Sequence, residues 1–356
     1  MSLLEKMKKT GYKKVTERTK MVVDAVNDIF GDLVPTDVPA FNIAISGKYN
    51  GGVGGGLVSI AGPSKHFKTL FCLLAASAYM NHHDDAIMLY YDSEGGASLE
   101  YLKMMNIPVE RVVHIPIENI EELSFDMMQK LDSLTEKEKV FIMIDSVGNL
   151  ASKKEITDAL NEKSVADMTR AKALKAFFRM ATPIIKRLNI PFYVIQHTYK
   201  SMDLFPTDVV SGGTGGVYSS DTVLIIGKRQ VKDGKELIGN EFVLKAEKSR
   251  FIKEKSAIPV TVLFDGGLYK YSSLFEWACE LGYIDVPAQG WYTRTNVLDD
   301  KKWRKKEIET NSEEFFKPII NDTKFIEGIE AMYRLGSSKS LDIEQLDDIT
   351  EKYDDE

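Results

Sequence analysis

The chain has 356 residues, 44% of them hydrophobic, which is enough to bury a substantial core in roughly two domains. It contains no run of about 18 apolar residues and no apolar stretch near its N-terminus, so we expect a cytoplasmic protein rather than a membrane-spanning or secreted one. A structural metal is not expected, because the two cysteines lack C-x-x-C spacing and the five histidines are scattered. The net charge of −7 argues against a uniformly basic surface, although lysines and arginines cluster at 5–20, 245–255 and 301–306.

Helical and strand patterns follow one another in an order typical of α/β proteins. Residues 3–30 carry a helical pattern of apolar and charged positions. From Leu57 onward short apolar runs alternate with helical segments, which predicts a mostly parallel, doubly wound sheet with strands at 57–62, 86–92, 111–115, 140–145, 191–197 and 222–227. Two further runs, 241–247 and 259–267, have connections too short for a crossover, so we predict that they pair antiparallel at the sheet edge.

The segment that follows the sheet has a different pattern. Helical signals at 272–284 and 316–336 flank a lysine-rich insert, which predicts a small α+β C-terminal domain. The acidic stretch after it predicts a disordered tail. The expected organisation is therefore a helical N-terminal segment, an α/β core, a small C-terminal domain and an acidic tail, at residues 1–35, 36–270, 271–340 and 341–356.

The clearest chemical signal is the segment GPSKHFKT, which comes directly after a predicted strand and directly before a predicted helix. In such a loop backbone N–H groups surround phosphates, Lys68 reaches the β and γ oxygens, and Thr69 can hold Mg²⁺. Phe67 stands where the G-x-x-x-x-G-K-[ST] pattern has its second glycine, so a plain turn before a helix is an equal alternative. The candidate nucleotide-binding residues of the loop are Gly62, Pro63, Ser64, Lys65, His66, Phe67, Lys68 and Thr69.

Two carboxylates follow predicted strands. Asp145 ends the strand 140–145, where it would lie beside Mg²⁺ held by Thr69, although an aspartate that caps the following loop is the plainer alternative. Glu94 lies just beyond the strand 86–92, at the edge where open α/β sheets bind ligands, and could orient or deprotonate an attacking water.

Phosphoryl transfer also needs a cation for the charge of the transition state, and the sequence around the loop offers none. Lys248 and Arg250 lie on a late strand at the predicted sheet edge, where they could serve a neighbouring subunit. From the pattern alone, ordinary exposed charges on an edge strand are the more common explanation.

Together these motifs resemble the RecA family. The run YYDSE and the helix after it resemble the family's second strand with its catalytic glutamate, and Tyr101 falls where a tyrosine stacks on adenine. VIQHTY resembles the ATP-responsive switch, with His197 in place of the usual glutamine, and KSR at 248–250 resembles the basic pair that reaches a neighbouring subunit's ATP. Phe67, His197 and the runs NLASKKE, DALNEK, DMTRAK, IIGKRQ and EKSR are similar to the phage UvsX-type recombinases of that family.

The resemblance implies two DNA-binding loops at the axis of a helical filament. The first spans Ser152–Thr169 and the second Thr198–Val217, which contains the glycine-rich stretch SGGTGG. Aromatic side chains there could stack on bases and basic ones could contact phosphates, although a plain surface role is about as common for any one of them. The candidate DNA-binding residues are Lys153, Lys154, Arg170, Tyr199, Lys200, Phe205, Gly212 and Gly213.

The activity that this resemblance implies is ATP-dependent DNA recombination, with ATP and Mg²⁺ as cofactors. The chain would form a filament on single-stranded DNA, pair it with homologous duplex DNA, and cooperate with a recombination mediator and a single-strand-binding protein. Residues 1–35 would serve polymerisation, and the catalytic residues would be Lys68, Glu94, His197, Lys248 and Arg250. Two alternatives share parts of the pattern: a hexameric helicase with a RecA-type core, and a non-catalytic, ATP-gated DNA-binding scaffold.

Overall fold

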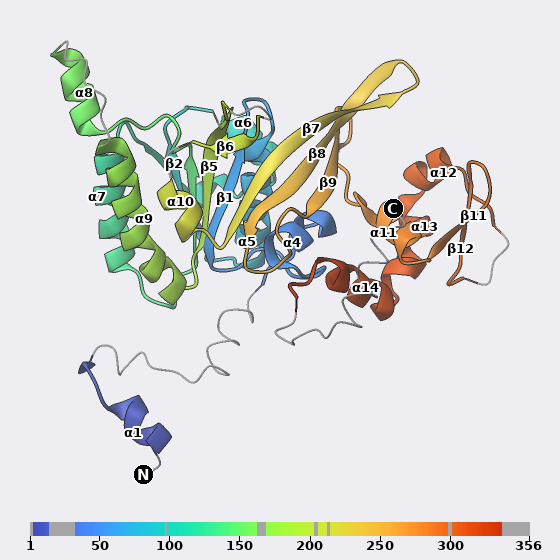
Figure 1. The fold of residues 1–356 in the computed structure, drawn as a ribbon, viewed down its shortest axis with the longest axis horizontal. Coiled ribbons are helices and arrows are strands. Elements are labelled where there is room, and N and C mark those ends of the chain that lie inside the picture. Colours follow the sequence, from blue (N-terminus) through green and yellow to red (C-terminus); the bar gives the residue numbers. More distant parts are fainter. Residues whose placement is uncertain are drawn as a thin grey trace.

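The computed structural model describes residues 3–13, 33–96, 98–161, 169–202, 206–211, 214–297 and 301–336. Within these ranges ten strands form one large sheet in the order β10-β9-β8-β7-β1-β5-β4-β2-β3, with β6 attached to β5 (Figure 1). The strands of this sheet are β1 (Gly56–Gly62), β2 (Ile87–Asp92), β3 (Val112–Pro116), β4 (Val140–Asp145), β5 (Pro191–Lys200), β6 (Asp208–Val210), β7 (Thr222–Asp233), β8 (Glu236–Ser249), β9 (Ala257–Leu263) and β10 (Gly267–Leu268).

The sheet has a parallel half and an antiparallel half. The pairs β1·β5, β1·β7, β4·β5, β2·β4 and β2·β3 are parallel. β1 and β4 are buried along their whole length, because both of their faces are covered, and this is why their sequences are continuous apolar runs. The pairs β7·β8, β8·β9 and β9·β10 are antiparallel, which confirms the predicted pairing at this edge.

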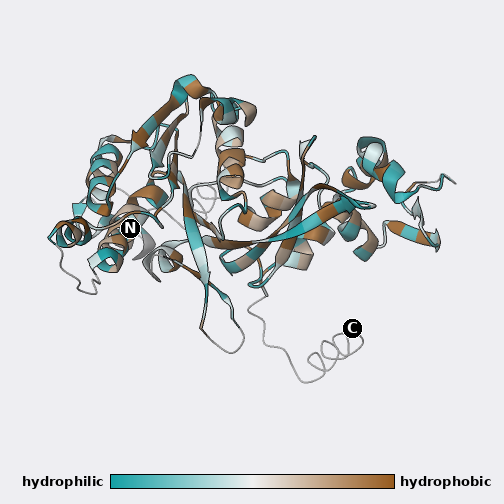
Figure 2. Ribbon diagram, turned by 90° about the horizontal axis from the view of Figure 1, so that it is seen from above, coloured by the Kyte–Doolittle hydropathy of each residue, from teal (hydrophilic) through white to brown (hydrophobic). Residues whose placement is uncertain are grey.

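Helices cover both faces of the sheet (Figure 1). One buried cluster includes Phe41 and Phe71 from α4 and α5, and a second includes Leu123 and Phe177 from α7 and α9. In Figure 2 the apolar residues run along the strands through the middle of the molecule, while the outward faces of the helices are hydrophilic. The helices before and around the sheet are α1 (Leu3–Lys9), α4 (Pro39–Ser46), α5 (Lys68–His82), α6 (Leu99–Met104), η1 (Val109–Arg111), α7 (Ile120–Ser133), α8 (Lys153–Leu160), α9 (Thr169–Arg187) and α10 (Thr214–Ser219).

The C-terminal region combines short helices with a two-stranded hairpin, as the mixed pattern predicted. Its elements are α11 (Leu274–Glu280), β11 (Ile284–Ala288), β12 (Trp291–Arg294), α12 (Lys305–Thr310), α13 (Ser312–Ile320) and α14 (Thr323–Tyr333). Trp277, Phe315 and Phe325 belong to the same buried cluster as Phe41 and Phe71, so this region packs continuously with the core.

Several expectations fall partly outside the described ranges. Of the helical pattern at 3–30, the structure describes Leu3–Lys9 as a helix, and residues 14–32 and the acidic stretch 341–356 lie outside the described residues. None of the helices that the structure describes combines the length and the apolar character that crossing a bilayer demands.

Candidate functional site

The predicted strand, loop and helix are present around the candidate phosphate loop. β1 ends at Gly62 and α5 begins at Lys68. Phe67 precedes the helix with φ 53° and ψ 31°, the left-handed conformation that a glycine adopts most easily. Its ring lies 4.9 Å from the ring of Phe242 on β8, and this contact offsets part of the steric penalty. Phe67 therefore reproduces the backbone of the missing glycine and adds a contact that glycine lacks.

Lys68 is folded back onto its own loop. Its side chain is largely buried, and its Nζ donates to the carbonyl of Pro63 at 2.9 Å. Burial lowers the pKa of Lys68, and the nearby Glu94 and Asp145 carboxylates oppose that shift. Among the described residues the Pro63 carbonyl is the one hydrogen-bond acceptor of the lysine, and a phosphate oxygen can replace this neutral partner.

Thr69 and Asp145 lie together, as the spacing predicted. The Thr69 hydroxyl donates to Oδ2 of Asp145 at 2.7 Å, and Asp145 is only 3% exposed. Burial raises the pKa of Asp145 to about 6, with the Thr69 hydrogen bond opposing it and the carboxylates of Glu94 and Asp92 adding to it. A carboxylate in this setting gains from a nearby cation.

These donors fit magnesium. A hydroxyl and a carboxylate oxygen are hard ligands, and Mg²⁺ typically takes one or two protein ligands and completes its octahedron with water and phosphate oxygens. In the described part of the chain no group of three or more histidine, cysteine, aspartate or glutamate side chains could hold a metal ion. The donor set is therefore suited to an ion shared with a phosphate rather than to an all-protein cage.

Glu94 joins three strand ends. Its Oε1 accepts hydrogen bonds from Ser146 Oγ at 2.6 Å and Asn149 Nδ2 at 3.0 Å, both in the loop after β4, and lies 3.0 Å from Nε2 of His197 on β5. The sequence placed Glu94 and His197 in separate motifs, and the fold brings them together because β2, β4 and β5 are neighbours in the sheet.

The turn that carries Glu94 is itself fixed by Asp92. Oδ1 of this buried carboxylate accepts from the backbone N–H groups of Glu94 at 2.9 Å and Gly95 at 2.7 Å. Its other oxygen, Oδ2, lies 3.0 Å from Nε2 of His114 on β3. Glu94 thus leaves the end of β2 from a turn with two backbone hydrogen bonds.

Sequence reasoning did not single out Ser146, Asn149 or Asp92. Each lies within four residues of Asp145 or Glu94, at the carboxyl ends of neighbouring strands. Polar residues at that edge were the available signal. His197 also needs Gly148 beside it, because a Cβ at Gly148 would lie 2.6 Å from the imidazole Cδ2 atom.

Tyr101 lies on the short helix α6, downstream of Glu94. Its half-buried ring packs against the core, and burial raises the pKa of its hydroxyl to about 12, so the ring is neutral. The position is compatible with stacking on an adenine, and its role stays a prediction.

Lys248 and Arg250 lie away from the phosphate loop. The expectation that they lie on an edge strand is wrong, because β8, which carries Lys248 and ends just before Arg250, pairs with both β7 and β9. Lys248 Nζ donates to the carbonyls of Val217 at 3.1 Å and Tyr218 at 2.8 Å, and Arg250 Nε lies 2.9 Å from Oδ1 of Asp221. None of the hydrogen bonds or ion pairs among the described residues joins either cation to the phosphate loop of the same chain. The sequence did not point to Asp221 at all.

The candidate DNA loops are described in part. In the first, α8 begins with a capping box formed by Ser152 and Glu155, and Lys154 pairs with Asp158 at 2.8 Å. In Figure 1 helix α8 projects from the body of the molecule at the upper left, and Lys153 on this helix is exposed. In the second loop, Tyr199 is 58% exposed and Lys200 pairs with Asp208 at 2.9 Å. Phe205, Gly212 and Gly213 lie outside the described residues.

Arg170 is placed differently from a phosphate-contact residue. Its Nε donates to the carbonyl of Leu150 at 2.7 Å, and its Nη2 donates to those of Val147 at 3.0 Å and Gly148 at 2.8 Å. The guanidinium therefore holds the loop that carries Asn149, which is a positioning role rather than an outward-facing one.

Comparison with known proteins accounts for most of the chain. Residues 9–269 match the family model of the RecA N-terminal domain, and residues 271–329 match that of the C-terminal domain of the bacteriophage T4 recombination and repair protein. The recombination and repair protein of Enterobacteria phage T4 is 47% identical over 320 residues, which span 88% of this chain and 81% of that protein.

More distant relatives are bacterial RecA proteins. The RecA protein of Limosilactobacillus reuteri is 22% identical over 81% of this chain and 78% of its own length. The RecA protein of Petrotoga mobilis is 25% identical over 70% of this chain and 66% of its own length. The structure agrees with these similarities in two features: the strand, loop and helix around Lys68, and the carboxylate at the end of β4. The C-terminal match extends the similarity beyond the sheet. The chain therefore belongs to the RecA strand-exchange family, in the UvsX-type branch that includes the phage T4 protein.

Proposed function

We propose that the protein is a DNA-dependent ATPase that forms helical filaments on single-stranded DNA and catalyses homologous pairing and strand exchange. The observation that carries this proposal is the hydrogen-bonded cluster around Glu94, which connects the ends of β2, β4 and β5. β5 continues from His197 directly into the second candidate DNA loop. The same side chains therefore border the nucleotide site and a DNA loop.

Within the nucleotide site each residue has a distinct task. ATP bound with Mg²⁺ supplies the phosphoanhydride bond whose hydrolysis accompanies strand exchange. Lys68 neutralises charge on the β and γ oxygens after leaving the Pro63 carbonyl, and Thr69 and Asp145 are the magnesium ligands. Glu94 orients the attacking water, and Tyr101 stacks on the adenine.

Assembly completes the site. Lys248 and Arg250 are tied to Val217, Tyr218 and Asp221, away from their own phosphate loop, so in this proposal they serve the nucleotide of a neighbouring subunit. Residues 1–35 act as the polymerisation segment, and 271–340 and 341–356 act as the C-terminal domain and acidic tail. A recombination mediator and a single-strand-binding protein complete the proposed set of partners.

DNA contact is assigned to the two loops. Lys153, Lys154, Tyr199 and Lys200 are exposed or half-exposed, and together with Phe205, Gly212 and Gly213 they form the proposed DNA-binding set. We remove Arg170 from direct contact, because its guanidinium is bound to three carbonyls.

One assay separates this function from its alternatives. The protein is incubated with ATP, Mg²⁺, a circular single strand and a homologous linear duplex, and joint molecules are resolved on a gel. Wild type and a Lys48→Ala control, which removes only a surface partner of Glu330, should form joint molecules, and Lys68→Ala should form none, because it loses the charge that binds the phosphates. Unwinding of a forked duplex without joint molecules would identify a helicase, and DNA binding without ATP turnover would identify a scaffold.

A further inference from the structure

The two cations proposed to act on a neighbouring subunit are held by groups around the start of β7. Lys248 is bound to the carbonyls of Val217 and Tyr218 in α10, at 3.1 and 2.8 Å. Arg250 is bound through Nε to Asp221, which lies between α10 and β7. The placement of these cations therefore depends on this segment.

Asp221 is fixed from several directions. Its side chain is nearly buried, its Oδ2 accepts from the backbone N–H of Leu57 at 3.1 Å, and its Oδ1 also accepts from Lys186 Nζ at 2.6 Å. Its backbone carbonyl accepts from the backbone N–H of Arg250 at 3.0 Å. A carboxylate with this many partners cannot rotate freely, so it is a stable anchor for the arginine.

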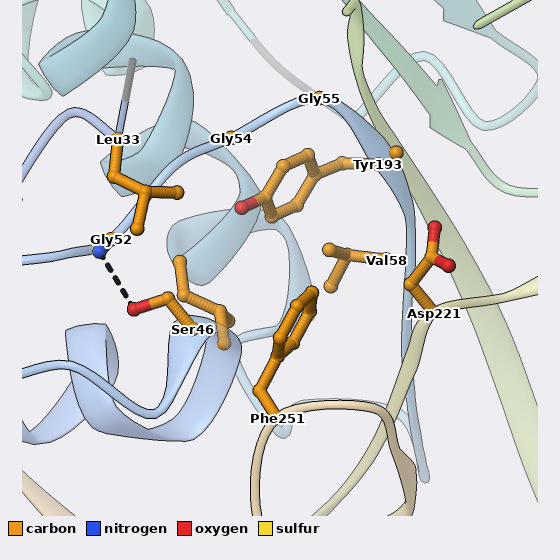
Figure 3. Close-up of a pocket in the computed structure, with 11 residues that line it drawn as sticks. Leu33, Ser46, Gly52, Gly54, Gly55, Val58, Tyr193, Asp221 and Phe251 are labelled. Atoms are coloured by element: carbon orange, nitrogen blue, oxygen red, sulfur yellow. Dashed lines mark hydrogen bonds between the residues drawn. The ribbon is translucent and has the colours of Figure 1, made fainter. Parts of the chain in front are cut away.

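The approach of Asp221 to β1 depends on a glycine. A Cβ at Gly56, which has φ 131°, would lie 2.5 Å from Asp221 Oδ2. Figure 3 shows Asp221 beside β1, with Val58 and Phe251 nearby, at the side of a small cavity of about 30 Å³. Gly56, the first residue of β1, thus makes room for this carboxylate.

The way Arg250 is held leaves its binding groups available. The ion pair with Asp221 joins Nε to Oδ1 at 2.9 Å, and no hydrogen bond of either Nη group is found among the residues that the structure describes. The side chain is 58% exposed. An exposed arginine that is already held by an ion pair to a fixed carboxylate loses less rotamer entropy when its Nη groups bind phosphate oxygens.

The surroundings also keep the cluster positive. Lys186 shares the Asp221 carboxylate with Arg250. The pKa of Lys248 is lowered, mainly by burial and further by the nearby charges of Arg250 and Lys186, while Asp221 opposes this shift. Asp221 therefore orients Arg250 without cancelling the positive charge of the group.

We propose that Asp221 is a positioning residue for ATP turnover, which orients Arg250 for the nucleotide bound to the neighbouring subunit. The inference rests on the proposed function and adds a residue to it. Asp221 itself touches no nucleotide in this scheme, because it acts through the arginine.

The test uses Asp221→Asn in the full chain. Asparagine has the same shape and can still accept from the Leu57 N–H, but it lacks the charge that holds Arg250. DNA-stimulated kcat should fall about tenfold or more, a part of the roughly 10³ to 10⁵ that arginine fingers contribute, while KM for ATP changes less than about twofold. Glu241→Gln, which removes the partner of Arg229 on the same two strands, is the matched control and should leave kcat unchanged.

Two further arms exclude a merely structural role. Asp221→Asn combined with Arg250→Ala should be no slower than Arg250→Ala alone, because the aspartate acts through the arginine. Filaments that mix Asp221→Asn with Lys68→Ala subunits should recover activity, since some interfaces then pair an intact phosphate loop with an intact Asp221 and Arg250.

Arg250→Lys covers the case in which Asp221→Asn does not fold. It leaves the anchor intact, but an ammonium bound to Asp221 has no outward-facing pair of donors, so kcat should fall nearly as far as in Arg250→Ala.

The outcomes separate the inference from the function beneath it. The positioning role would be overturned if Arg250→Ala is slow while Asp221→Asn or Arg250→Lys keeps the kcat of the wild type. Additive losses of kcat in the double variant would overturn it as well. Either result would leave the proposed function in place. Wild-type kcat in Arg250→Ala would overturn both the trans cation and this inference.

Discussion

At Phe67 the backbone adopts a left-handed conformation that costs a residue with a Cβ about 1 to 2 kcal/mol. Two effects oppose each other there, since glycine would relieve the strain and lose the contact with the Phe242 ring. Alanine would keep the strain and lose the same contact. Relief of strain favours Phe67→Gly over Phe67→Ala by about 1 kcal/mol. The backbone entropy that glycine adds to the unfolded chain reduces this difference in stability.

Urea denaturation of the three proteins without nucleotide measures this order. The wild type should be the most stable if the ring contact outweighs the strain, and Phe67→Ala the least stable in either case. An alanine variant as stable as the glycine variant would show that the penalty of the left-handed conformation at Phe67 does not exceed the backbone entropy that glycine adds to the unfolded chain.

Among single residues, the sequence predicted those that lie in the loop after a predicted strand or at the end of one. Thr69 and Asp145 lie together as expected, because the loop between β1 and α5 and the carboxyl end of β4, which is separated from β1 by β5 alone, lie at the same edge of the sheet. Ser146, Asn149 and Asp221 could not be found this way. Their partners Glu94 and Arg250 are distant in sequence, and the contacts exist only once the strand order is known.

At the scale of elements, the segment from β4 to α9 depends on Arg170. This side chain binds three carbonyls of the loop that carries Asn149, and Asn149 in turn binds Glu94. Arg170→Ala leaves those carbonyls without their charged donor, so the free energy of unfolding should fall by about 1.5 to 3 kcal/mol. ATP turnover should fall several-fold as well, because Glu94 loses a fixed neighbour.

Lys153→Ala is the contrasting change on α8. It should leave stability unchanged and reduce the salt dependence of single-stranded DNA binding by about 0.7 in the log-log slope for one lost phosphate contact. Fluorescence anisotropy across a salt series measures the slope, and thermal unfolding measures stability. A stable Arg170→Ala protein with a reduced slope would restore Arg170 as a direct DNA contact.

The order of elements was easier to predict than their partners. Alternating apolar runs identified the parallel strands and the antiparallel edge, because buried strands and amphipathic helices have different periods. The same patterns wrongly placed Lys248 on an edge strand, because the further strands β9 and β10 extend the sheet beyond β8, and they could not show that α10 carbonyls accept its hydrogen bonds. α10 contains two glycines in six residues and has little helical signal of its own.

For the whole molecule, the distribution of charge matters more than the net value of −7. The chain has 46 basic and 53 acidic residues, and residues 341–356 hold one of the former and eight of the latter, which leaves 45 of each in the rest. We predict that this segment competes with phosphate for the basic loops. A chain that ends at Ser340 should therefore bind single-stranded DNA more tightly than the full chain.

The effect should be largest at low salt and low free Mg²⁺, because screening and divalent ions weaken the competition in the full chain. Affinities of both proteins across a salt and Mg²⁺ series provide the measurement. Curves that coincide at every condition would mean that the acidic segment does not compete for the DNA site.

The backbone ladder of β1, β7 and β8 has a mechanical consequence. Ser59 of β1 pairs with Val223 of β7, and Val223 pairs with Lys248 of β8, so three hydrogen-bonded strands link the phosphate loop of a subunit to one of the cations proposed to serve its neighbour. Strands in a sheet are held about 4.8 Å apart by their backbone hydrogen bonds. If Lys248 and Arg250 serve a neighbour as proposed, each subunit joins the loop that receives a cation to the cations that it donates through a backbone ladder of three strands. A displacement at one interface would then be transmitted through the sheet toward the next, which would give a row of such subunits a mechanical direction.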